Sequence, residues 1–267
     1  MGETLQASVR PNATAPGLDP ESPYSARLSA RSALYTELHC LLDSQDTALS
    51  SAEYRALVVV ENRLSRKTTS AKAKLWEELK KRYRLDSADP LFTSFWMEWR
   101  RCGSEAERGL TAYLLLALND RFVADLGIEF LFPLLRRAPA ELRVDDVLAF
   151  IERARTAHPE VEGWSENTRR AVAQKYSASI RDFGLAKGTY NKTTVRPALY
   201  GAPVRLLVRA LRSMGTGALD ILNAPAFRLL GLEGTEVIDA FGELNRVGAL
   251  RFRMQGDVVE LDIEEGR

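Results

Sequence analysis

The sequence predicts a mainly α protein: a helical bundle with helix-turn-helix-like modules and a C-terminal winged-helix module that contains a short β-hairpin. Two observations predict this fold. From Tyr24 onward, apolar residues recur almost entirely at helical spacing, and the stretch from Gly234 to Ile263 has the pattern of a helix followed by two short strands. The chain of 267 residues is long enough to form two or three small domains.

The first part of the helical region predicts a helix-turn-helix-like unit. Leucines between Leu34 and Leu42 define a first amphipathic helix, and Ser50 with Glu53 forms a capping box that begins a second one. After a short connection at residues 64–67, a hydroxyl side chain within residues 68–70 can cap a third helix. Two helices joined by such a tight turn are typical of helix-turn-helix proteins.

An aromatic stripe follows this unit. Phe92, Phe95, Trp96 and Trp99 are spaced so that they share one face of a helix. Such a stripe is more often part of a hydrophobic core than a stacking platform, so we expect it to be buried. Further helices are expected over residues 110–118, 122–135, 145–156 and 165–183, and from Val204 onward.

Composition suggests where the domains begin and end. Residues 1–23 hold four prolines and no apolar run, which predicts a disordered tail. Beyond this disordered N-terminal tail (1–23), we expect an N-terminal helical domain with the helix-turn-helix-like unit (24–139), a middle helical segment with a basic loop (140–202) and a C-terminal winged-helix-like module (203–267).

The C-terminal module carries the clearest pattern. We expect a helix from Thr235 to a stop at Gly248, and then alternation of apolar and polar residues over 250–255. Gly256 and Asp257 supply turn chemistry, and the alternation resumes over residues 259–263. A helix that continues into an amphipathic hairpin is the outline of a winged helix.

The formal net charge of +1 hides two basic blocks. Arg63 to Arg84 holds nine cations and two acids, a net charge of +7, and Trp164 to Arg212 holds ten cations and two acids, a net charge of +8. Residues from Gly231 onward have a net charge of −5. Two basic blocks in a nearly neutral chain indicate a surface that binds a polyanion such as DNA. The alternative is a solvated surface without a ligand.

The candidate DNA-binding residues are cations of these two blocks. In the second block, three arginines at i, i+4 and i+7 lie opposite apolar residues, which predicts a purely cationic helix face. The loop at residues 187–196 mixes cations, hydroxyls and an aromatic ring, a composition that suits phosphate and sugar contacts or an ordinary polar loop. The candidates are Arg63, Arg66, Lys67, Lys72, Lys74, Arg169, Arg170, Lys192, Arg196, Arg205 and Arg209.

Nothing in the sequence indicates an enzyme. Only His39 and His158 are present, without ligand or nucleophile partners at suitable spacing, so we expect no catalytic site, metal or cofactor. Cys40 and Cys102 are isolated, which favours a reducing cytoplasm. The longest apolar run, residues 110–118, is half the length needed to cross a bilayer, so we expect a cytoplasmic protein without a membrane contact.

Two stretches resemble a known family. One is the turn Glu61 to Lys67 leading to Leu79 and the run Arg82 to Leu85; the other is His158-Pro159 with Trp164 to Arg170, followed by Phe183-Gly184-Leu185. In these patterns the chain, from about Tyr24 to Leu199, resembles the BrxA family of BREX bacteriophage-defence systems. The resemblance implies a mostly helical, non-enzymatic accessory protein that binds DNA within a multi-protein defence system. The module beyond about Ala202 lies outside it.

The leading hypothesis is a double-stranded DNA-binding accessory protein of a BREX-type system, possessing helix-turn-helix-like modules at both ends. Other BREX proteins are possible partners. One alternative is an adaptor that docks proteins of the same assembly, and another is a transcriptional repressor. Because residues 235–263 have a net charge of −3, we expect the last module to pack or to recruit a partner while the earlier helices hold the DNA.

Overall fold

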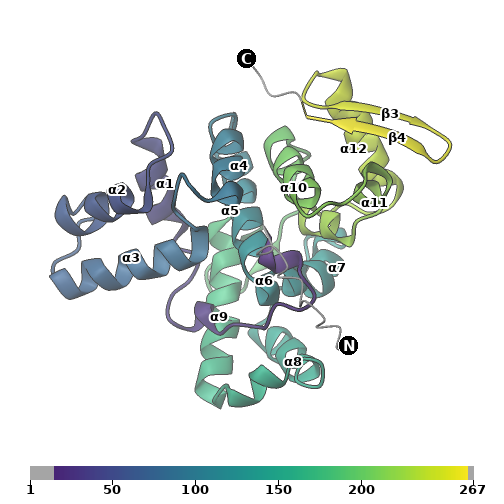
Figure 1. Cartoon of the computed structure of the whole chain (residues 1–267). Helices are drawn as coiled ribbons and strands as arrows, with labels where there is room; N and C mark the ends of the chain where they lie inside the picture. Colours follow the sequence, from purple (N-terminus) through teal and green to yellow (C-terminus); the bar gives the residue numbers. More distant parts are fainter. Residues whose placement is uncertain (1–14, 264–267) are drawn as a thin grey trace, which may run out of the picture.

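A computed structural model describes residues 15–263, and the helix α5 (Glu105–Asn119) lies at the centre of its fold (Figure 1). Every residue from Gly109 to Asn119 is buried. A helix that is apolar on all sides is stable in water only when other elements surround it. Helices α4 (Pro90–Trp99) and α10 (Gly201–Ser213) pack against α5 and against each other.

The N-terminal helices form a lobe beside this centre, on the left of Figure 1. Its elements are α1 (Tyr35–Asp43), α2 (Ser51–Arg55), the π-helical segment η3 (Ala56–Val60) and α3 (Thr69–Tyr83). The predicted capping box is present, because the Ser50 side chain and Glu53 bond each other's backbone N–H. Thr68 caps α3 by accepting a hydrogen bond from the N–H of Ala71.

The predicted core role of the aromatic stripe is confirmed. Phe92 and Phe95 have no exposed surface, and Trp96 and Trp99 are 7% and 2% exposed. The stripe lies on α4, and Asp89 caps this helix by accepting hydrogen bonds from the N–H groups of the first turn.

The middle of the chain is helical at nearly the predicted positions. Its elements are α6 (Arg121–Asp125), the π-helical segment η4 (Leu126–Leu131), α7 (Phe132–Arg136), α8 (Val144–Ala154), the 3-10 helix η5 (Pro159–Gly163) and α9 (Glu166–Asp182). Helices α8 and α9 pack against each other. Gly184 follows α9 with a φ of +81°, which is the left-handed conformation that terminates many helices.

The segment around the expected basic loop at residues 187–196 contains more structure than expected. Strands β1 (Ala186–Lys187) and β2 (Thr193–Thr194) form a short antiparallel hairpin. Helix α10 begins at Gly201, before the predicted start at Val204. Pro203 is compatible with this early start, because the N–H groups of a helix's first turn have no partner within the helix.

The C-terminal hairpin is confirmed. The module contains α11 (Ala218–Leu222), the 3-10 helix η6 (Pro225–Leu230), α12 (Thr235–Arg246), β3 (Arg251–Gln255) and β4 (Val258–Asp262). The strands are antiparallel, with Phe252 opposite Leu261, and the turn contains Gly256 at a φ of +58°. The hairpin extends away from the body at the upper right of Figure 1.

The predicted tail is partly wrong. Residues 1–14 lie outside the described residues, but residues 15–23 are ordered, and the 3-10 helix η1 (Pro16–Leu18) packs against α5 and α6. Gly17 is so close to α5 that a Cβ atom would lie 1.8 Å from the carbonyl oxygen of Ala117. Proline and glycine suggested disorder, yet here proline begins a short helix and glycine permits close backbone contact. A second 3-10 helix, η2 (Arg27–Ser29), lies against α9.

One hydrophobic cluster contains residues of every predicted domain, from Ala15 to Ile263. The domain division stays a prediction. Across residues 15–263, no helix combines the length and the apolar character needed to cross a membrane.

Candidate nucleic-acid interface

One cation of the first basic block is buried in the core, and others lie on the surface of α3. Arg82 is 1% exposed; it pairs with Glu78 and donates hydrogen bonds to the carbonyl oxygens of Arg27 and Arg31. Lys67, Lys74 and Lys81 are exposed and are spaced by seven residues, which is about two helical turns. One cation of the block therefore supports the fold, whereas Lys74 and Lys81 lie in a row along the outer side of α3, with Lys67 in the turn before it.

Lysines and arginines have different roles in this protein. All eight lysines lie in the two basic blocks, and none of them forms an ion pair within residues 15–263. The candidate arginines of the first block are paired, because Arg63 lies 3.0 Å from Glu61 and Arg66 lies 2.5 Å from Glu37. Lys67, Lys72 and Lys74 are thus the candidates of this block whose charge is not already matched by a carboxylate.

The second block shows a similar division, except that Arg170 has no carboxylate partner among the described residues. Arg169 pairs with Glu152 at 3.1 Å, and Arg196 pairs with Glu236 at 2.8 Å. Arg170 is exposed at the start of α9, whereas the Nζ atom of Lys192 donates to the carbonyl oxygen of Thr189 at 3.1 Å. The structure does not bring the two blocks into one cluster: the first follows α3, and the second is spread over α9, the β1–β2 hairpin and α10.

The expected cationic outer face of α10 is wrong for Arg205 and Arg209. Arg205 is 8% exposed, and its Nε atom lies 2.7 Å from Oε2 of Glu98, a residue with no exposed surface. The Nε atom of Arg209 lies 3.2 Å from Oε1 of the same carboxylate. The two guanidinium groups face α4, so they are not placed to contact a DNA phosphate. Arg212 lies on the surface and pairs with Asp262 at 3.0 Å.

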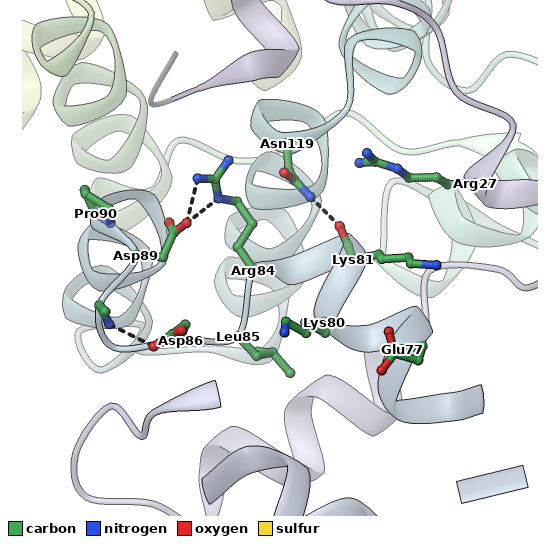
Figure 2. A pocket seen from close by; sticks show the side chains of 11 residues that line it. Arg27, Glu77, Lys80, Lys81, Arg84, Leu85, Asp86, Asp89, Pro90 and Asn119 are labelled. Carbon is green, nitrogen blue, oxygen red and sulfur yellow. Dashed lines mark hydrogen bonds and ion pairs between the residues drawn. The ribbon is translucent and has the colours of Figure 1, made fainter. Parts of the chain in front are cut away.

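An open pocket of about 600 Å³ adjoins the end of α3 (Figure 2). Figure 2 shows Arg84 held by Asp89 and the Asn119 amide donating to the carbonyl oxygen of Lys81. The charged residues of its lining are Arg27, Glu77, Lys80, Lys81, Arg84, Asp86 and Asp89. Since four cations face three acids, the pocket itself is close to neutral. Its lysines nevertheless extend the row on α3, and Lys80 and Lys81 belong to the block without being among the predicted contacts.

The two histidines contact different residues. His39 is near Asp43 and Glu105, whereas the ring of His158 stacks on Tyr24 with the centroids 3.5 Å apart. Within residues 15–263, no group of three or more His, Cys, Asp or Glu side chains is arranged to hold a metal ion.

Fold and surface together define a mainly helical protein with two lysine-bearing basic surfaces and a C-terminal hairpin module. A model of the BrxA family matches residues 22–209, so the chain belongs to the BrxA family of BREX phage-defence systems. The match ends within α10, and α11, α12, β3 and β4 lie beyond it. A comparison with curated proteins gave no match.

Proposed function

We propose that this protein is a non-enzymatic, double-stranded DNA-binding accessory protein of a BREX-type phage-defence system. The observation that carries the proposal is the division between lysines and arginines. Many arginines are matched by carboxylates, whereas the lysines of both basic blocks have no carboxylate partner within the described chain. Unmatched ammonium groups attract a polyanion, and their contacts with phosphates release bound counterions.

The spacing of the lysine row suits a DNA backbone. Seven helical residues span about 10 Å, so Lys74 and Lys81 lie about 10 Å apart along α3, and Lys67 lies in the turn just before this helix. A lysine ammonium is a flexible point charge and contacts phosphates without reading a base. We therefore expect binding with little sequence preference, which favours an accessory role over a repressor.

The helical arrangement around this row supports a helix-turn-helix-like unit. Helix α2 continues into η3, a turn at residues 61–68 follows, and α3 packs against η3. In helix-turn-helix proteins the second helix enters the major groove of DNA, and the turn lies near the sugar–phosphate backbone of the DNA. Here the turn carries Arg63 and Lys67, and α3 carries Lys74.

The C-terminal module favours a second function, an adaptor. The order α10, α11, α12 and a β3–β4 hairpin is that of a winged helix, but the outer face of the hairpin is balanced in charge, because Arg251 pairs with Glu260 at 3.2 Å. Val258, Val247 and Met254 are 75%, 69% and 46% exposed. A partly apolar surface whose charges balance suits another protein of the assembly better than it suits phosphates.

A mobility-shift series with the full chain tests DNA binding. Wild-type protein should bind duplex DNA at low salt and lose affinity as salt rises. The triple variant Lys67→Ala, Lys74→Ala, Lys81→Ala should bind more weakly, and its slope of log K against log [salt] should be smaller by about 0.9 per lost phosphate contact. Arg246→Ala, which removes an exposed cation of α12 outside both blocks, is the control and should bind as the wild type does.

The same series separates the alternatives. No binding at low salt would refute the DNA-binding proposal, and co-purification with a neighbour-encoded protein would then support the adaptor. Protection of one defined sequence in a footprint would support the repressor instead. An unchanged salt slope in the triple variant would show that the row on α3 is only a solvated surface.

A further inference from the structure

The most exposed aromatic side chain of the described protein is Tyr190, at the tip of the β1–β2 hairpin. It is 95% exposed. The strands on either side pair Ala186 with Thr194 and Lys187 with Thr193. A tyrosine ring in this position contributes almost nothing to the hydrophobic core, so its presence calls for another explanation.

The hairpin is fixed to the body along β2. The N–H of Leu142 donates to the carbonyl oxygen of Lys192, and the N–H of Thr194 donates to that of Ala140, both at 2.8 Å. The segment at residues 140–142 therefore runs antiparallel beside β2, with an isolated bridge between Glu141 and Thr193. Within the hairpin, the N–H of Val195 donates to the carbonyl oxygen of Leu185 at 2.8 Å and extends the pairing of β1 with β2.

Two further features constrain the hairpin on either side of the tip. The buried hydroxyl of Thr194 lies 3.1 Å from the carbonyl oxygen of Leu134, to which it donates. Gly188 has a φ of +96°, and a Cβ atom there would lie 2.2 Å from the carbonyl oxygen of Asn191, so the turn requires glycine. Because the strands beside the tip are held in place, the chain loses less conformational entropy when the ring binds a partner.

Cations flank the ring. Lys187 lies in β1 and Lys192 lies just before β2, and neither forms an ion pair within residues 15–263. The contact of the Lys192 Nζ atom with the carbonyl oxygen of Thr189 keeps that ammonium group near the tip. Arg143 and Glu141 are the exposed charged residues of the adjoining segment. The tip thus combines one exposed aromatic face with two unmatched positive charges.

We propose that the β1–β2 hairpin binds DNA that contains an unpaired base, with the Tyr190 ring stacked on that base and Lys187 and Lys192 on the neighbouring phosphates. Aromatic rings beside cations are how proteins hold single strands, since every base has a π-face. Bases within an intact duplex are already stacked on their neighbours and leave no face for the ring. This inference rests on the proposed function, and it adds a second DNA structure to the duplex bound through α3.

The experiment uses the full chain and DNA labelled with 2-aminopurine, whose fluorescence is quenched by stacking. The label is placed in a single strand, opposite a gap in a duplex, or inside a fully paired duplex. Wild-type protein should quench the label in the first two. Tyr190→Ala should abolish this quenching and lower the affinity for gapped DNA roughly 5- to 150-fold, the value expected for one stacked base, while its affinity for paired DNA stays unchanged.

Three matched variants define the contact. Tyr190→Phe keeps the ring and should behave as the wild type does. Tyr190→Leu keeps the apolar bulk without the aromatic face and should behave as Tyr190→Ala does. Val258→Ala, which truncates a side chain that is 75% exposed at the tip of the other hairpin, should leave the quenching and the affinity for each DNA unchanged.

The possible failures are distinguishable. If the wild type binds duplex DNA and Tyr190→Ala binds every DNA equally well, the stacking inference is wrong and the proposed function stands. If Tyr190→Leu retains full affinity, the contact is hydrophobic and base stacking is refuted. If the wild type binds no DNA of any kind, the inference is refuted together with the proposed function.

Discussion

Glu98 and Arg205 form a buried ion pair between α4 and α10, with Oε2 of the carboxylate 2.7 Å from Nε of the guanidinium. Oε1 of Glu98 also lies 3.2 Å from Arg209 and 3.3 Å from Arg101. A charge without exposed surface is tolerated only where opposite charges and hydrogen bonds replace water. This carboxylate therefore joins the aromatic helix of the N-terminal body to the first helix of the C-terminal module.

Neutralising this carboxylate should strongly destabilise the fold. Glu98→Gln leaves Arg205 and Arg209 facing an uncharged amide, and removing one partner of a buried pair costs about 3–5 kcal/mol of unfolding free energy. Urea unfolding followed by circular dichroism measures the change. Asp239→Asn, at an exposed position of α12, is the control and should change stability by less than about 0.5 kcal/mol. A loss below about 1 kcal/mol in Glu98→Gln would contradict the structural role given to the pair.

The close contact of η1 with α5 predicts an unequal effect of two glycine substitutions. Gly17→Ala would place its Cβ 1.8 Å from the carbonyl oxygen of Ala117, so the segment must move away, at an expected cost of about 1–3 kcal/mol. Gly163→Ala meets no atom within 4 Å and should be nearly neutral. Thermal unfolding of both variants gives the comparison, and equal melting temperatures would show that residues 15–18 do not pack on α5.

The contact of Glu160 with the N-terminal segment predicts acid sensitivity. Partial burial opposes ionisation of Glu160, but the N–H of Tyr24 and the His158 ring bond the carboxylate, and together they lower its pKa from the ordinary value of 4.5. A lowered folded-state pKa stabilises the fold above the unfolded value, and this contribution is lost as the pH falls through the folded value.

The melting temperature of the wild type should therefore fall on acidification below a pH of about 4.5, and Glu160→Gln should show a smaller fall over the same range. Glu243→Gln, at an exposed position of α12, serves as the matched variant and should retain the wild-type profile. Parallel profiles for the wild type and Glu160→Gln would count against this source of acid sensitivity.

The two thiols should differ in reactivity. Cys40 is exposed, whereas burial raises the pKa of the Cys102 thiol to about 12. The thiolate is the reactive form, so a thiol reagent at neutral pH should modify one cysteine in the native protein and both after unfolding. Cys40→Ser should abolish the native reaction. Rapid modification of Cys102 in that variant would indicate that the contact between α4 and α5 opens.

Elements with strong local signals could be predicted from the sequence. The capping box at Ser50, the buried stripe from Phe92 to Trp99 and the hairpin around Gly256 all depend on residues close together in the chain. Spacing and turn chemistry determine such features before any distant contact forms. The helix of the α9 region was predicted within one residue for the same reason, since Ser165 caps it and Gly184 follows it.

The predictions that are wrong concern residues whose surroundings are determined by a segment far away in the sequence. The pattern of α10 places Arg205 and Arg209 on a polar face, and the sequence of that helix cannot show that Glu98 covers this face from α4. A signal was present, because Glu98 is an acid within an aromatic helix and needs a buried cation as its partner. Likewise, nothing near Gly17 in the sequence reveals that the α5 backbone lies against it.

The buried cations of this protein are arginines, and its lysines have no carboxylate partner within the described chain. A reagent specific for lysine can therefore change the charge of the surface and leave the buried ion pairs intact. Reagents that acetylate primary amines act on lysine and leave guanidinium groups intact. Such treatment would remove five positive charges from the first basic block and three from the second, while Glu98 keeps its ion pairs with α10. A cellular acetyltransferase would have the same selectivity, so the positive charge offered to a polyanion could be adjusted reversibly on a fold that stays assembled.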